Sequence, residues 1–135
     1  MSNHESEELS PQTREQVSAV MLDVVNVFLR LRERLPASHI GTFLKVATNE
    51  GATVSELAVK CSVSGAVMSR HLGELGGRNR RGGAGLGLIA VVQEIHGDRR
   101  ERRVVLTARG VAIARQAIAA ARGEGPVSQG LRKRT

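Results

Sequence analysis

Aromatic side chains are nearly absent from this 135-residue sequence, which has no Trp or Tyr and only Phe28 and Phe43 as aromatics. The core must therefore be built from aliphatic side chains, and there is no set of rings on which unstacked bases could lie. This scarcity argues against a protein that binds single-stranded nucleic acid by stacking bases on aromatic residues.

Cysteine and long apolar runs are equally scarce. Cys61 is the single cysteine, so no intramolecular disulfide can form, and its place in an apolar repeat favours a small buried side chain over a redox-sensing thiol. The longest run of apolar residues and glycines, 82–92, is too short and too rich in glycine to span a membrane. The acidic first residues do not resemble a signal peptide, so we expect a cytoplasmic protein with no membrane partner.

The sequence also lacks the residue patterns of a catalytic or metal-binding protein. Its four histidines are scattered, no Cys/His spacing suits a metal ion, and no motif pairs a nucleophile with a base. We expect His39 to be solvated, and His71 to be a packing residue or a phosphate contact. The sequence therefore predicts neither an enzyme nor a protein that carries a metal or a cofactor.

Acidic residues are sparse in the second half of the chain, although the whole chain has 20 Lys and Arg against 13 Asp and Glu. Residues 1–69 carry six basic and eight acidic side chains, whereas residues 70–103 carry eight and four, and residues 104–135 carry six and one. The basic excess thus begins at Arg70, and a field of this kind favours a polyanionic partner.

Two short amphipathic helices joined by a turn are predicted over 53–75, and the rest of the chain is organised around them. Apolar residues recur at helical spacing in each half, and Ser64 can cap the second helix by accepting a backbone N–H bond. The outer face of the second helix is slim and free of acids, as a helix in a DNA major groove requires, although an ordinary helical hairpin in a core shares the pattern. This face comprises Gly65, Ala66, Ser69, Arg70 and Gly73.

A long helix is predicted over 10–35, after a first segment, 1–9, that we expect to be disordered. Ser10 followed by Pro11 is a typical helix start, and the helix should end before Pro36. Its apolar stripe is longer than a small domain can cover. This favours pairing with a second copy of the chain, although packing within the chain would also bury the stripe.

The segments on the two sides of this helical pair differ in composition. A helix over 39–49, capped by Ser38, is predicted before it, and the stretch 76–87, half of it glycine, follows it. This stretch is either an idle linker or an arm that closes on DNA phosphates; it lacks the G-K-[ST] ending of a nucleotide-binding loop. Its arginines are Arg78, Arg80 and Arg81.

Two strands, 88–95 and 103–106, are predicted next, joined by an arginine-rich tip over 96–102. A last amphipathic helix follows over 108–122, and then a basic, flexible tail over 123–135. The first and last helices are the candidate dimerisation elements. Their contact residues are expected to be Val17, Val24, Phe28 and Leu31 in the first helix, and Val111 and Ile118 in the last.

The order of these elements over 38–121 resembles the MarR family of bacterial transcription regulators. The most specific likeness is Asp98-Arg99-Arg100 followed by Leu106-Thr107-x-x-Gly110, similar to the family's D-x-R and LT-x-x-G signature, with Thr107 as the cap of the last helix. The expected fold is mainly α with a small antiparallel β-hairpin (α+β). It is a winged helix-turn-helix domain over 36–107 with a long N-terminal dimerisation helix.

The resemblance implies a homodimer whose second helices enter major grooves and whose hairpins, or wings, enter minor grooves. Arg100 would reach into the minor groove and be held there by an ion pair with Asp98. The residues implied to contact DNA are Ser64, Gly65, Ala66, Ser69 and Arg70 on the helix, and Asp98, Arg99, Arg100 and Arg102 on the wing.

The chain also departs from the family. Gly65 and Ala66 replace polar residues common there, and no aromatic lining supports a small-molecule effector. The sequence thus predicts a sequence-specific regulator of transcription, most often a repressor, that binds double-stranded DNA as a nucleoid-associated homodimer. The alternative is a protein–protein adaptor or antagonist of another regulator built on the same winged scaffold, which the neutral Gly65 and Ala66 favour slightly.

Overall fold

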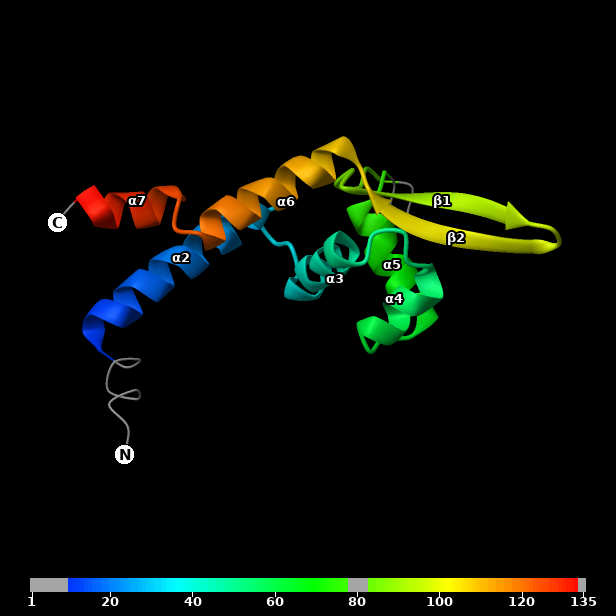
Figure 1. Ribbon diagram of the computed structural model, residues 1–135, viewed down its shortest axis with the longest axis horizontal. Coiled ribbons are helices and arrows are strands. Elements are labelled where there is room, and N and C mark those ends of the chain that lie inside the picture. Colours follow the sequence, from blue (N-terminus) through cyan, green and yellow to red (C-terminus); the bar gives the residue numbers. More distant parts are fainter. Residues whose placement is uncertain (1–9, 78–82, 134–135) are drawn as a thin grey trace, which may run out of the picture. The chain divides into compact units, whose positions relative to one another are not determined.

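The computed structural model describes residues 10–77 and 83–133, and Figure 1 shows it to be mainly helical with one two-stranded antiparallel sheet, as the sequence predicts. The chain forms two compact units, one made by residues 34–114 and one by residues 1–33 together with 115–135. The expected disorder of 1–9 and the loop arginines Arg78, Arg80 and Arg81 lie outside the described residues. The elements are α2 (Pro11–Leu29), α3 (Ala37–Thr48), α4 (Val54–Lys60), α5 (Gly65–Leu75), β1 (Ile89–His96), β2 (Arg99–Leu106), α6 (Ala108–Ala121) and α7 (Pro126–Lys133).

A core of aliphatic side chains and Phe43 holds α3, α4 and α5 together in the unit 34–114. Thr53 caps α4 by accepting the Glu56 backbone N–H at 3.1 Å, and Ser64 caps α5 by accepting the Val67 backbone N–H at 3.1 Å. The turn between these helices places Ser62 in the left-handed region with φ 55°. The largest fully buried side chains of this unit are Phe43, Val46, Leu57, Met68, Leu75, Leu88 and Val104.

The hairpin is longer than the sequence indicates. β1 and β2 pair from Ile89 with Leu106 to His96 with Arg99, so the loop contains only Gly97 and Asp98. Gly97 has φ 63°, which a two-residue hairpin turn with glycine at its first central position requires. The predicted start of the second strand at 103 was therefore wrong, because the tight turn lets the arginine-rich segment pair with β1.

Hydrogen bonds fix the base of the wing to the loop between α3 and α4 and to the segment before β1. The Gly51 backbone N–H donates to the Val104 carbonyl at 2.8 Å, and the Val104 N–H donates to the Ala52 carbonyl at 2.9 Å. On the other side, the Thr107 hydroxyl donates to the Gly87 carbonyl at 2.6 Å and accepts the Gly110 backbone N–H at 3.0 Å, which caps α6 as predicted.

The glycine of Leu-Thr-x-x-Gly has a packing reason. A Cβ at Gly110 would overlap the carbonyl oxygen of Leu88, so only glycine lets α6 start so close to the strand. The motif thus combines a helix cap, a hydrogen bond to the segment before β1 and a close backbone approach.

Helix α2 ends earlier than predicted. It stops at Leu29 with Arg30 as its C-cap, whereas the sequence suggested a helix to 35. Leu35 does not extend the apolar stripe of α2, because it is buried and belongs to the unit 34–114. Likewise α3 begins after Pro36, so Ser38 lies inside the helix and is not its cap.

The predicted flexible tail contains helix α7, which packs against α2 in the unit formed by 1–33 and 115–135. The buried Asp23 carboxylate of α2 accepts the backbone N–H groups of Val127 and Ser128, each at 2.9 Å, and so caps α7. A Cβ at Gly125 would overlap this carboxylate. The prediction of a disordered tail was wrong because the cap lies on a distant helix.

The Asp23 carboxylate is held in its charged form. Burial alone would raise the pKa of Asp23, but hydrogen bonds from the Ser128 and Val127 backbone, helped by the positive charge of Arg30, outweigh it and lower the pKa.

Among the described residues, no helix is long and apolar enough to cross a membrane.

Candidate nucleic-acid interface

Helix α5 presents a slim surface to solvent. Its capping residue Ser64 is also exposed, and a Cβ at Gly65 would meet nothing within 4 Å, so a flat partner surface could approach the start of the helix closely. Met68 and Leu72 face the core and anchor the helix. The exposed residues of this surface, which are those expected from the sequence, are Ser64, Gly65, Ala66, Ser69 and Arg70.

His71 is a packing residue that connects α5 to α3. Its Nδ1 forms a 2.9 Å hydrogen bond with the Thr42 hydroxyl, and its ring centroid lies 4.6 Å from that of His39. Burial and the positive charge of Arg70 lower the pKa of His71, so the imidazole is neutral at pH 7. The expectation of a solvated His39 was incomplete, since its ring contacts His71; sequence spacing alone gave no signal for this pair.

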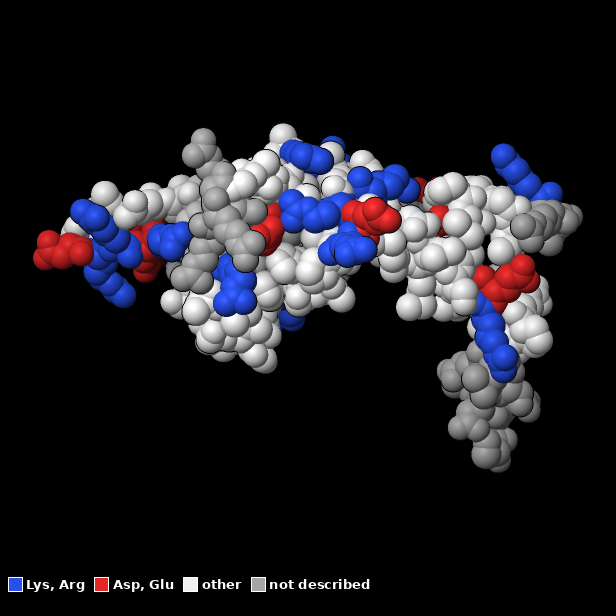
Figure 2. Space-filling model, turned by 180° about the vertical axis from the view of Figure 1, so that it is seen from behind, with Lys and Arg blue, Asp and Glu red and all other residues white. Residues whose placement is uncertain are grey.

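Strand alternation sorts the wing arginines onto two faces, because successive side chains of a strand point in opposite directions. On β2, Arg100 and Arg102 share one face, and Arg99 and Arg103 share the other. Figure 2 shows Lys and Arg side chains gathered near the turn of the hairpin, with acidic side chains beside them. The acids of the paired strands, Glu94 and Glu101, both lie on the face of Arg99.

Arg103 neutralises that acidic face and connects it to the loop between α3 and α4. Its Nε donates to Glu94 at 3.0 Å, its Nη2 to Glu101 at 2.6 Å and its Nη1 to the Gly51 carbonyl at 2.8 Å. Hydrogen bonds from His96 and Arg103 hold the pKa of Glu94 below its ordinary value. The face of Arg100 and Arg102 is left with two arginines and no acid in the paired strands, whereas the opposite face has two arginines and two glutamates.

The same acidic face contains the group of described residues that could hold a metal ion. Glu94, His96 and Glu101 place one ligand atom each within 4.8 Å of one another. Arg103 already bridges both carboxylates, so a cation would have to displace its guanidinium.

The expected ion pair between Asp98 and Arg100 is not formed between these two described residues. Asp98 lies in the turn, whereas Arg100 lies within β2 opposite Ile95, and both Asp98 and Arg100 are exposed. The ion pairs of the wing instead centre on Arg103, which sequence reasoning left out of the candidate site.

Helix α2 carries an uncovered apolar stripe on the side away from its buried residues. Ala19, Asp23 and Val27 are buried at four-residue spacing, and a second set at the same spacing is exposed. Phe28 is 1% exposed, so it belongs to the chain's own core and not to the expected dimer surface. The uncovered residues are Val17, Met21, Leu22, Val25 and Leu29, with Ile118 of α6 in the same unit; the other expected residues Val24, Leu31 and Val111 are partly exposed.

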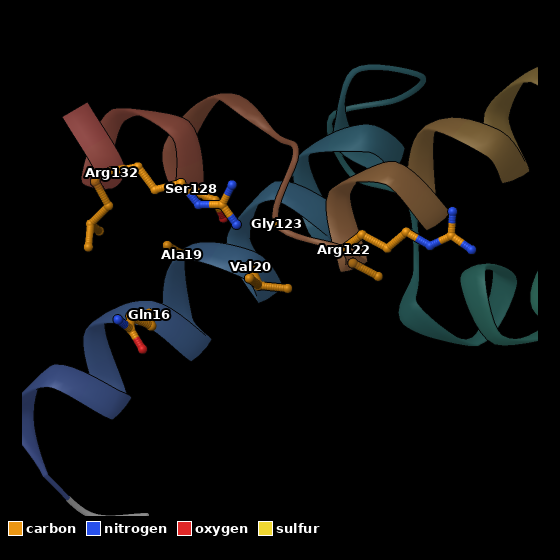
Figure 3. Close-up of a pocket in the computed structure, with 9 residues that line it drawn as sticks. Gln16, Ala19, Val20, Arg122, Gly123, Ser128 and Arg132 are labelled. Carbon is orange, nitrogen blue, oxygen red and sulfur yellow. The ribbon is translucent and has the colours of Figure 1, made fainter.

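A cavity of about 380 Å³ opens between α2, α7 and the end of α6 within this unit. Figure 3 shows Arg132 reaching toward Gly123, while Arg122 points away from the cavity. A Cβ at Gly123 would lie 3.1 Å from the Arg132 guanidinium, so this side chain already fills part of the space. Apolar residues complete the lining, including Ala19, Val20 and Leu131.

The chain is similar in fold to a solved bacterial protein. The crystal structure of RV1404 from Mycobacterium tuberculosis matches 95% of this chain and 85% of its own, with a TM-score of 0.62 and 19% sequence identity. At this identity the likeness shows the fold alone. No protein-family model and no curated protein matches the sequence.

Proposed function

We propose that the protein is a winged helix-turn-helix regulator of transcription that binds double-stranded DNA as a homodimer. The observation that carries the proposal is the pairing of two surfaces in the unit 34–114. One is the slim surface at the start of α5, where no acid lies among the exposed residues from Ser64 to Arg70, and the other is the wing face that holds Arg100 and Arg102 without an acid. A helix of this kind fits a major groove, and arginines at a hairpin tip suit the negative potential of an A·T-rich minor groove.

The resemblance to the MarR family supports the same assignment, because its D-x-R and LT-x-x-G signatures fall on the wing turn and the start of α6. Repression by occupying a promoter is the mode of action that we propose. Direct base reading by α5 is limited to Ser64, Ser69 and Arg70, since Gly65 and Ala66 offer no side-chain donor. The wing, which reads groove width and flexibility, supplies the rest of the specificity.

A second copy of the chain is the proposed cover of the stripe formed by Val17, Met21, Val25 and Leu29. A two-fold dimer would present two α5 helices to two half-sites. The same stripe also gives weight to the adaptor alternative, because a helix of another regulator could cover it.

Selection of bound fragments from a pool of random duplex DNA tests the proposal, with sedimentation at micromolar concentration as the companion measurement. We expect enrichment of a two-fold symmetric site with an A·T-rich segment and a mass of about twice 14.5 kDa. A pool that shows no enrichment, together with a monomer in sedimentation, would favour the adaptor alternative.

A further inference from the structure

The acid-free face of the wing is uncharged along one strand and cationic along the other. Val91, Gln93 and Ile95 lie on it from β1, and Arg100 and Arg102 lie on it from β2. Ile95 is 68% exposed and pairs across the strands with Arg100. An isoleucine left this open at the end of a hairpin contributes nothing to the core of its own chain.

The dimensions of the hairpin and of DNA suggest what could cover Ile95. Neighbouring strands lie about 4.8 Å apart, and the minor groove of B-DNA is about 6 Å wide. The two side chains therefore cannot both enter a narrow groove. If the arginine enters, the residue one strand across meets the groove wall, which is made of uncharged deoxyribose sugars.

We propose that Ile95 packs against the deoxyribose wall of the minor groove into which Arg100 reaches. This inference rests on the proposed function and names a contact that charge alone cannot supply. The guanidinium is attracted by the negative potential of the groove, and burial of the isoleucine side chain removes apolar surface from water. The wing tip thus holds DNA by one salt-dependent contact and one that salt does not weaken.

The test compares full-length variants on the duplex recovered by selection, over a range of salt concentrations. Ile95→Ala should lower affinity by about tenfold, the order expected when an isoleucine that becomes half buried in each wing is cut back to alanine. The slope of log affinity against log salt should not change, because no phosphate contact is lost. Ile95→Thr, which keeps the β-branched shape that suits a strand, should show part of the same loss.

Val92→Ala is the matched control. Val92 is on the same strand and 45% exposed, but it lies on the opposite face, across from Arg103. The Val92→Ala variant should bind DNA with the affinity of the wild-type protein. Equal losses for the Val92 and Ile95 variants would point to a weakened hairpin and overturn the inference.

The remaining outcomes separate this inference from the proposed function. If the wild-type protein binds no duplex, both fail. If it binds and Ile95→Ala binds equally well, the sugar contact is wrong and the DNA-binding function stands. If Ile95→Ala instead lowers the mass measured by sedimentation without DNA, Ile95 is covered by a second chain and the inference is overturned.

Discussion

Neighbouring arginines of β2 should contribute very differently to DNA binding, because alternate residues of the strand face opposite ways. Arg100 and Arg102 lie on the face without acids, whereas Arg99 shares its face with Glu94 and Glu101. The perturbation is a set of single alanine substitutions at these three arginines. All three side chains are exposed, so their removal should leave the melting temperature nearly unchanged.

The magnitudes follow from the number of charges that meet the DNA. Losing one phosphate contact lowers the slope of log affinity against log salt by about 0.9, so Arg102→Ala should lower it by roughly 1.8 for two wings. Arg100→Ala should weaken DNA binding by about 1–3 kcal/mol, and the loss should be largest on sites with a narrow A·T-rich minor groove. Arg99→Ala removes the same formal charge but should change the slope by less than half as much as Arg102→Ala.

Fluorescence anisotropy with a labelled duplex, repeated at several salt concentrations, measures both quantities. Circular dichroism melts of each variant provide the folding control. If Arg99→Ala reduces affinity and slope as much as Arg100→Ala or Arg102→Ala, the wing meets DNA through both faces, and the assignment of one face as the interface is refuted.

Three further predictions concern the scaffold. Gly110→Ala should lower the free energy of unfolding by about 1–3 kcal/mol through overlap with backbone, whereas Gly41→Ala, in an open position on α3, should raise it by about 0.5–1 kcal/mol; equal denaturation midpoints would contradict this. Met21→Glu combined with Ile118→Glu should give a monomer in sedimentation and weaken DNA binding, and a persistent dimer would exclude this stripe as the interface. Asp23→Ala should lower the free energy of unfolding by about 1–3 kcal/mol. Because folding lowers the pKa of Asp23, this stabilisation is present above about pH 4 and is lost as the pH falls further. The melting temperatures of wild type and variant should therefore converge in acid, which thermal melts over a range of pH would measure.

Local signals in the sequence predicted the helix-turn-helix correctly because the groups that fix it are neighbours in the chain. Ser64 caps α5 through a residue three positions later, and Thr107 caps α6 in the same way. Met68, Leu72 and Leu75 recur at helical spacing in the sequence, and all three lie on the buried side of α5. Such contacts depend on spacing, which the sequence states directly.

Contacts between distant residues could not be predicted in this way. Helix α7 is capped by Asp23, which is more than one hundred residues earlier, so the sequence predicts a flexible tail over 123–135 where the structure has a helix. A proline at the first helical position, with basic residues in the last turn, was the available signal. The hydrogen bond between His71 and Thr42 left no comparable pattern.

The composition of the wing tip indicated an interface, but not which of its residues form one. Interpreted as a loop, 96–102 is a cluster of equivalent arginines around two acids, Asp98 and Glu101. Because the turn contains only two residues, most of this segment belongs to a strand whose side chains point alternately to two faces. Arg99, Glu101 and Arg103 lie on one face, and Arg100 and Arg102 lie on the other. A polyanion would then meet one uncompensated face, so the length of the turn, and not the number of arginines, decides which face of the wing we propose as the interface.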